Sequence, residues 1–157
     1  MYSMINVLTV VLFLFHQNAD YKIDLGQYYD SELHEKPNGY VEAFTILDAE
    51  GNQEYVLSIT KVGMPKGRLL PDVYSEQYKM AILSKCGCDI VSSKQQSFTN
   101  FNAQEFKILR NGKHAYVLSA TTDGNLYNIS YSSDGEANTE AKYPEFERVM
   151  NTMVFYN

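Results

Sequence analysis

Alternating apolar and polar residues along much of the chain predict an antiparallel sheet. The segments Tyr40 to Asp48 and Glu54 to Val62 are rich in β-branched and aromatic residues, and residues 49–52 between them contain the glycine expected in a hairpin. Further upstream, Tyr21, Ile23 and Leu25 alternate with polar residues, as in a short strand. This half of the chain therefore predicts a short strand followed by a hairpin.

The second half predicts a three-stranded meander. Two of the strongest short hairpin signals, Asn111-Gly112 and Asp123-Gly124, separate its strands. The strands are predicted at residues 105–110, 114–122 and 126–132, with a more polar strand at 94–101 before them. Apolar residues occupy one face of the last strand and polar residues the other, which indicates a sheet with one buried side.

Two helices are predicted from apolar residues that recur at helical spacing. The first begins after Asp72, which can cap it, and ends near Gly87; its apolar face is Tyr74, Tyr78, Ala81 and Ile82. The second is predicted to begin near Pro144, after a solvated loop at residues 134–142. Its core-facing stripe is Phe146, Val149, Met150 and Met153. Sequential hairpins with helices between them favour an α+β fold over a parallel, doubly wound one.

The N-terminus has the features of a secretory signal peptide. Val7 to Phe15 is an unbroken run of apolar residues and threonine, and no Asp, Glu, Lys or Arg precedes Asp20. The run is too short to cross a bilayer as a helix but matches the length of a signal-peptide core. We predict cleavage after Ala19, which leaves residues 20–157 as a single domain without a transmembrane anchor, in the periplasm or outside the cell. The alternative is a buried strand, because the same residue types suit a strand covered on both sides.

Composition limits the kinds of partner. The 157 residues carry a net charge of −6, so the protein has little of the positive charge that binding to a phosphate backbone requires. We predict no nucleic-acid partner.

Three stretches resemble the PsbP family of photosystem II extrinsic subunits, whose fold is shared by secreted bacterial relatives and by a Ran-binding nuclear-transport protein. They are Phe-Asn-Ala-Gln-Glu-Phe-Lys-Ile at 101–108, Leu-Tyr-Asn-Ile-Ser-Tyr-Ser at 126–132, and the ending from Tyr143 to Phe155. The chain ends this helix in Met-Val-Phe, where the family has Ser-Phe. The resemblance implies an antiparallel β-sheet flanked by helices, an α/β/α sandwich, and for many members a non-catalytic role in docking onto other proteins. The photosynthetic members help to retain inorganic ions, but no ion-binding residue can be transferred to a position in this chain.

The two cysteines, Cys86 and Cys88, form a Cys-Gly-Cys sequence. In an exported protein they are expected to be oxidised, and a bond that spans one glycine is expected to be more reducible than a structural disulfide. The pair is therefore a candidate redox site, although redox motifs more often have Cys-x-x-Cys spacing, which favours an adventitious disulfide or two inert thiols. Neither His34 nor His114 has zinc-ligand spacing with the pair, and we predict no metal centre and no cofactor.

Two groups of residues are candidates for binding a partner protein. Tyr28 and Tyr29 belong to a polar, tyrosine-rich segment, and Lys66 and Arg68 lie in a loop that is basic within an acidic protein. The alternatives are strand tyrosines selected for β-propensity and a loop that is simply solvated. Because no acid, base and nucleophile form a recognisable catalytic set, we predict a non-enzymatic docking domain. A carrier with an apolar groove between sheet and helix is the second hypothesis, and a thiol redox protein is the third.

Overall fold

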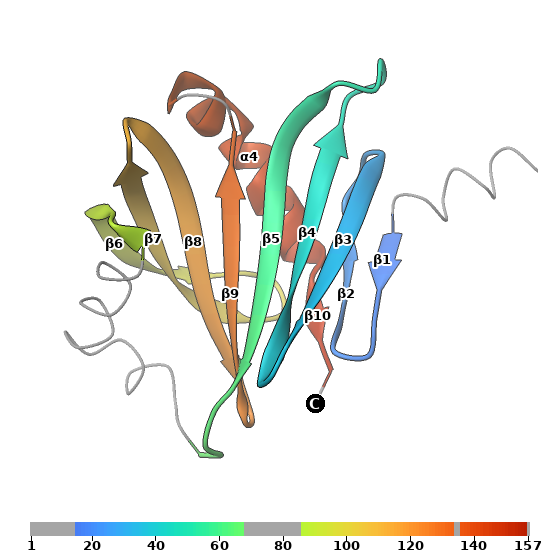
Figure 1. Cartoon of the computed structure of the whole chain (residues 1–157), viewed down its shortest axis with the longest axis vertical. Coiled ribbons are helices and arrows are strands. Elements are labelled where there is room, and N and C mark those ends of the chain that lie inside the picture. The colour runs from blue at the N-terminus through green and yellow to red at the C-terminus, as the bar shows by residue number, and fades with distance from the viewer. Residues whose placement is uncertain (1–14, 68–85, 134–135, 157) are drawn as a thin grey trace, which may run out of the picture.

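A seven-stranded antiparallel sheet forms the body of the protein (Figure 1). The computed structural model describes residues 15–67, 86–133 and 136–156. Along the sheet the strands follow the order β3-β4-β5-β9-β8-β7-β6. Their bounds are β3 (Tyr29–Lys36), β4 (Gly39–Leu47), β5 (Gln53–Gly63), β6 (Asp89–Ser97), β7 (Asn102–Arg110), β8 (Lys113–Thr122) and β9 (Asn125–Ser132).

A smaller sheet of three strands brings distant parts of the chain together. It has the order β1-β2-β10 and consists of β1 (Phe15–Gln17), β2 (Tyr21–Asp24) and β10 (Val154–Phe155). Both outer strands run antiparallel to β2. Strands from the two ends of the described chain are therefore joined through β2.

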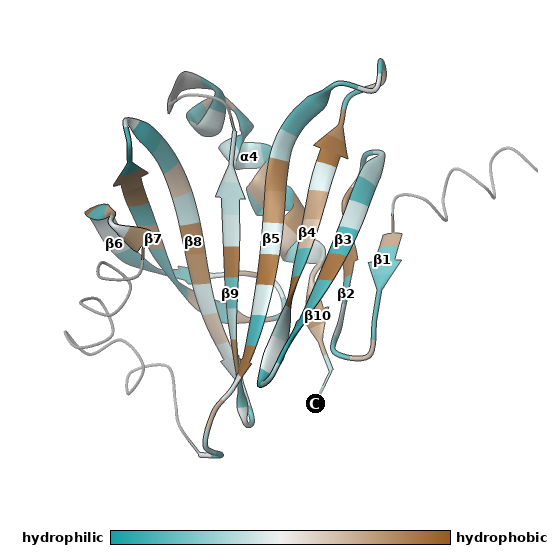
Figure 2. Cartoon of the chain, viewed as in Figure 1, coloured by the Kyte–Doolittle hydropathy of each residue, from teal (hydrophilic) through white to brown (hydrophobic). Residues whose placement is uncertain are grey.

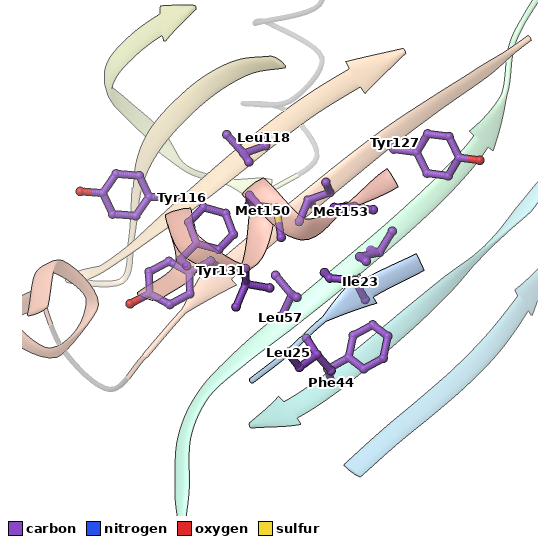
Figure 3. Close-up of a cluster of buried hydrophobic side chains, with 14 of the residues drawn as sticks. Ile23, Leu25, Phe44, Leu57, Tyr116, Leu118, Tyr127, Tyr131, Met150 and Met153 are labelled. Atoms are coloured by element: carbon purple, nitrogen blue, oxygen red, sulfur yellow. The ribbon is translucent and has the colours of Figure 1, made fainter. Parts of the chain in front are cut away.

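One helix, α4 (Glu136–Thr152), packs behind the large sheet in the view of Figure 1. The hydropathy colours of β4, β5 and β9 alternate in Figure 2, as expected for strands with one face in the core. Side chains from β2, β4, β5, β8, β9 and α4 converge in that core (Figure 3). The predicted stripe of the closing helix is confirmed, since all four of its side chains are fully buried: Phe146, Val149, Met150 and Met153.

The predicted hairpin and meander are confirmed. β4 pairs with β5, and β7, β8 and β9 pair in succession. Asn111 and Gly112 both have positive φ, 50° and 75°, as a two-residue hairpin turn of this hand requires. The polar strand predicted at 94–101 lies instead at Asp89–Ser97, because residues 98–101 form the turn into β7.

The predicted start of the closing helix is wrong. The helix begins at Glu136, so Pro144 lies inside it and the expected loop at 134–142 is largely helical. Contacts with the sheet hold the turns before the proline: the Tyr131 hydroxyl donates to the Thr139 carbonyl over 2.7 Å, and the Tyr116 hydroxyl donates to Glu140 over 2.7 Å. This tertiary packing outweighs the cost of proline in a helix.

The expected α/β/α sandwich needs correction as well. In the described residues the fold is a mostly antiparallel sheet with a single C-terminal helix on one face. The helix predicted after Asp72 falls largely outside the described residues. On the face opposite α4, Cys88, Phe106 and Ile108 form a second, smaller buried cluster.

Candidate functional site

The Cys86–Cys88 disulfide lies beside the smaller apolar cluster. The two sulfur atoms are bonded to one another, and Gly87 between them has a positive φ of 60°. Cys88 is buried with Phe106 and Ile108, whereas Cys86 is partly exposed. Cys86 is therefore the more exposed residue of the pair.

An open cleft of about 550 Å³ borders this disulfide. Its apolar wall includes Ile108 and Val117 on the sheet face opposite α4, and Arg110 and Lys113 add positive charge around the β7–β8 turn. The cleft could receive an extended, acidic segment beside a disulfide. Thiol–disulfide exchange at this pair remains a prediction.

The residues predicted to bind a partner do not form one surface. Tyr29 pairs with Ile46 near the end of β4, whereas Gly39 at the start of β4 pairs with Val62, close to the loop that carries Lys66. At about 3.3 Å per strand residue, the two groups are on the order of 25 Å apart along the sheet. Arg68 lies outside the described residues.

The two tyrosines of that prediction have different surroundings. The Tyr28 side chain is 47% exposed. The Tyr29 ring packs edge-on against Phe44 with 5.7 Å between centroids, so it belongs partly to the core. Lys66 is exposed and lies beside the β8–β9 turn, where Gly124 accepts a hydrogen bond from the Met64 backbone. Of the three described residues, Tyr28 and Lys66 offer free side chains to a partner.

A buried carboxylate on β4 is the most unusual polar group of the described chain. Glu42 is only 5% exposed and accepts hydrogen bonds from the Tyr21 hydroxyl and, over 3.0 Å, from the Asn18 side-chain amide. His16 Nε2 lies 2.9 Å from its other oxygen. Burial raises the pKa of the Glu42 carboxyl, but hydrogen bonds from His16, Tyr21 and Asn18 outweigh that effect and hold the pKa below its ordinary value. Conversely, burial, followed by the hydrogen bond to Glu42, raises the pKa of the Tyr21 hydroxyl.

The imidazole of His16 fills a space between three aromatic rings. Its centroid lies 4.8 Å from that of Phe44 and 6.0 Å from those of Tyr21 and Tyr29. Together the three rings and the Glu42 carboxylate form what we call the His16 seat. The sequence contains one signal of this seat that the predictions above do not use: Glu42 shares the inward face of its strand with Phe44 and Ile46.

A second buried acid has a structural role. Glu105 on β7 is 4% exposed and accepts a hydrogen bond from the Tyr143 hydroxyl of α4, and Lys94 Nζ lies 3.4 Å from it. Burial, followed by this hydrogen bond, raises the pKa of Tyr143. The pair fixes α4 on the sheet.

Within the described ranges, no three His, Cys, Asp or Glu side chains gather into a group that could hold a metal ion. No helix among those residues is long and apolar enough to span a bilayer.

Comparison with known proteins gives a structural match. By sequence, the chain matches neither a known protein family nor a curated protein. By structure, it is similar to cyanobacterial PsbP (CyanoP) from Synechocystis sp. PCC 6803, with a TM-score of 0.63 and 14% identity over 90% of this chain and 91% of that one. A protein from Bacteroides thetaiotaomicron gives a TM-score of 0.49 and 12% identity, over 87% of this chain and 45% of its own. The resemblance expected from the sequence is thus confirmed at the level of architecture, and the chain has the PsbP-like fold.

Proposed function

We propose that the chain is an exported, non-enzymatic domain that docks onto another protein or onto an envelope assembly. The observation that carries this proposal is that β3 is an end strand of the large sheet, with no further strand beyond it among the described residues. The Leu33 side chain on this strand is 52% exposed. The side chain of Tyr28, the residue immediately before the strand begins, is 47% exposed. Large apolar side chains beside an unpaired strand edge are typical of a surface that another protein covers.

The chemistry of β3 suits an interaction that is selective. Its outer edge offers backbone donors and acceptors to a partner strand. Asp30, Glu32, Glu35 and Lys36 place charges along the same strand, which hinders self-pairing of two copies. The strand is mostly hydrophilic in Figure 2, so its few apolar side chains stand out as anchors.

We expect the double substitution of Tyr28 and Leu33 by alanine to weaken partner binding by roughly tenfold or more, because a few anchors dominate most interfaces. The measurement is quantitative capture of partners from the native envelope fraction, compared with the wild-type chain. The matched control is Val91→Ala, which removes an apolar side chain that is also 52% exposed but lies on the opposite edge strand, β6. Equal loss in both variants would contradict a docking surface at β3.

Lys66→Ala tests the other end of the sheet in the same assay. Lys66 is distant from Tyr28. If partner binding is lost only in the Lys66→Ala variant, the interface lies at the loop after β5 and not at β3. If partner binding is lost only when Cys86 and Cys88 are both replaced by serine, the result favours the redox hypothesis instead.

The cleft beside the disulfide supports thiol exchange as a second candidate function. A thiolate of a substrate dithiol would attack the sulfur of Cys86, and the Cys88 thiolate would leave. The second substrate thiol would then attack the mixed disulfide, which yields an oxidised substrate and a reduced Cys86-Cys88 pair. By contrast, the carrier hypothesis gains no support along the closing helix, because Phe146, Val149 and Met150 fill the space between helix and sheet.

Export predicts a specific change in mass. The natively expressed protein should lack residues 1–19, since signal peptidase removes the leader on secretion. Intact-mass spectrometry of the purified protein measures this directly. A full-length form recovered from the cytoplasm would contradict export.

A further inference from the structure

The His16 seat has the chemistry of a cation-binding site. Aromatic faces attract a positive charge through their quadrupoles, and a nearby carboxylate adds a direct electrostatic partner. The Tyr21, Tyr29 and Phe44 rings surround the imidazole, and the Glu42 oxygen lies 2.9 Å from Nε2. The occupant of this site in the full chain is therefore one of the protein's own side chains.

The segment that supplies this occupant is weakly attached. β1 has three residues and pairs with β2 through Phe15↔Asp24, His16↔Ile23 and Gln17↔Lys22. Phe15 and Gln17 are exposed, so His16 is the residue of this strand that enters the fold. So short a strand contributes little pairing energy of its own.

Cleavage after Ala19 would empty the seat. Cleavage removes His16 and Asn18, which are two of the three partners of the Glu42 carboxylate. The third partner, the Tyr21 hydroxyl, remains. The place of the imidazole stays open, and one edge of β2 loses its partner strand.

We propose that in the processed chain an extended segment of a partner protein pairs with β2 in place of β1 and inserts a basic side chain into the His16 seat. This inference rests on the proposed docking function and on export. Charge complementarity selects the occupant, because a buried carboxylate deprived of two donors favours a positively charged replacement. The seat also adjoins a groove of about 470 Å³ lined by Glu42, Tyr40 and the exposed Leu33. The same partner can therefore contact both the seat and the β3 edge.

The test uses the chain's own strand as a probe. The processed chain is prepared by secretion, its mass is checked, and it is titrated with an acetylated, amidated peptide of residues 14–18, Leu-Phe-His-Gln-Asn, followed by NMR. We expect saturable binding to the processed chain and none to the full chain, whose seat is already filled. A peptide with His16→Ala should bind roughly tenfold more weakly, since it lacks both the ring that packs against Phe44 and the nitrogen that faces Glu42.

A protein variant provides the second arm. Glu42→Gln should weaken binding of the histidine peptide by a similar factor. The control is Glu32→Gln, which alters another histidine-paired carboxylate, 3.1 Å from His34 but exposed on β3, and should leave binding unchanged. The peptide substitution leaves the protein unaltered and remains informative if Glu42→Gln fails to fold.

Several outcomes would overturn the proposal. They are equal binding of the histidine and alanine peptides, equal binding by the full chain, absence of peptide binding, or a native protein that retains residues 15–19. If wild type and Glu42→Gln capture a native partner equally well, the result contradicts partner binding at the His16 seat but not the proposed docking function. Histidine-dependent peptide binding without any captured partner would support the seat and contradict docking.

Discussion

Truncating Phe146 to alanine should lower the free energy of unfolding by about 3–5 kcal/mol. The ring is fully buried, and it stacks on Tyr131 with 4.8 Å between centroids and 12° between planes. Its removal leaves a cavity between α4 and the centre of the sheet, which the rigid strands cannot close. Such a loss is a large part of the roughly 5–15 kcal/mol that stabilises an ordinary domain. Urea denaturation followed by circular dichroism measures it.

The control for this variant lies two residues further along the same helix. Arg148 is exposed and pairs with Glu145 over 3.0 Å, so Arg148→Ala should cost about 1 kcal/mol or less. Similar midpoints for Phe146→Ala and wild type would show that α4 contributes little to the core. That result would contradict the packing described for the closing helix.

The hairpins of the large sheet were predictable because their signals are local. Alternation defines the inward face of β5 and β9, and a two-residue turn such as Asn111-Gly112 fixes which strands are neighbours. Both signals can be recognised within about ten residues of sequence. The closing helix stripe could be predicted for the same reason, since a 3.6-residue period needs only two turns to be visible.

Features that depend on distant contacts could not be predicted in this way. β3 is a strand because β4 pairs with all eight of its residues, although its own residues are polar and exposed. The first turns of α4 are polar and precede a proline, so local propensity indicates a loop. Their helical state depends on hydroxyl groups contributed by β8 and β9.

The candidate sites differ in the same respect. Cys86 and Cys88 are two residues apart, so their pairing was easy to anticipate. Tyr28 and Lys66 were grouped by composition, and the strand register places them at opposite ends of the sheet. The His16–Glu42 contact joins residues 26 positions apart, and His16 lies within the segment that the sequence assigns to a signal peptide. Chain position alone gave no reason to associate it with the folded domain.

The β3–β4 hairpin has a glycine, Gly39, where the backbones of β4 and β5 approach closely. Gly39 has a φ of 149° and opens β4 after the Pro37-Asn38 turn. The Asn38 backbone and side chain both bond to Gly63 at the end of β5, the side-chain amide donating to its carbonyl over 3.0 Å. The turn is thereby held against the neighbouring strand.

Gly39→Ala should therefore destabilise the protein strongly. A Cβ at this position would lie 1.9 Å from the Lys61 carbonyl oxygen, which belongs to the backbone and cannot rotate away. We expect the unfavourable φ to lower the free energy of unfolding by about 1–2 kcal/mol, and the forced separation of β4 and β5 to lower it by about 1–3 kcal/mol more. Gly51→Ala is the matched control: its φ of 86° is also positive, but its Cβ would meet no atom within 4 Å, so only the first cost applies. Urea denaturation of the two variants isolates the steric part, and equal stabilities would show that the hairpin can shift to accommodate the added methyl group.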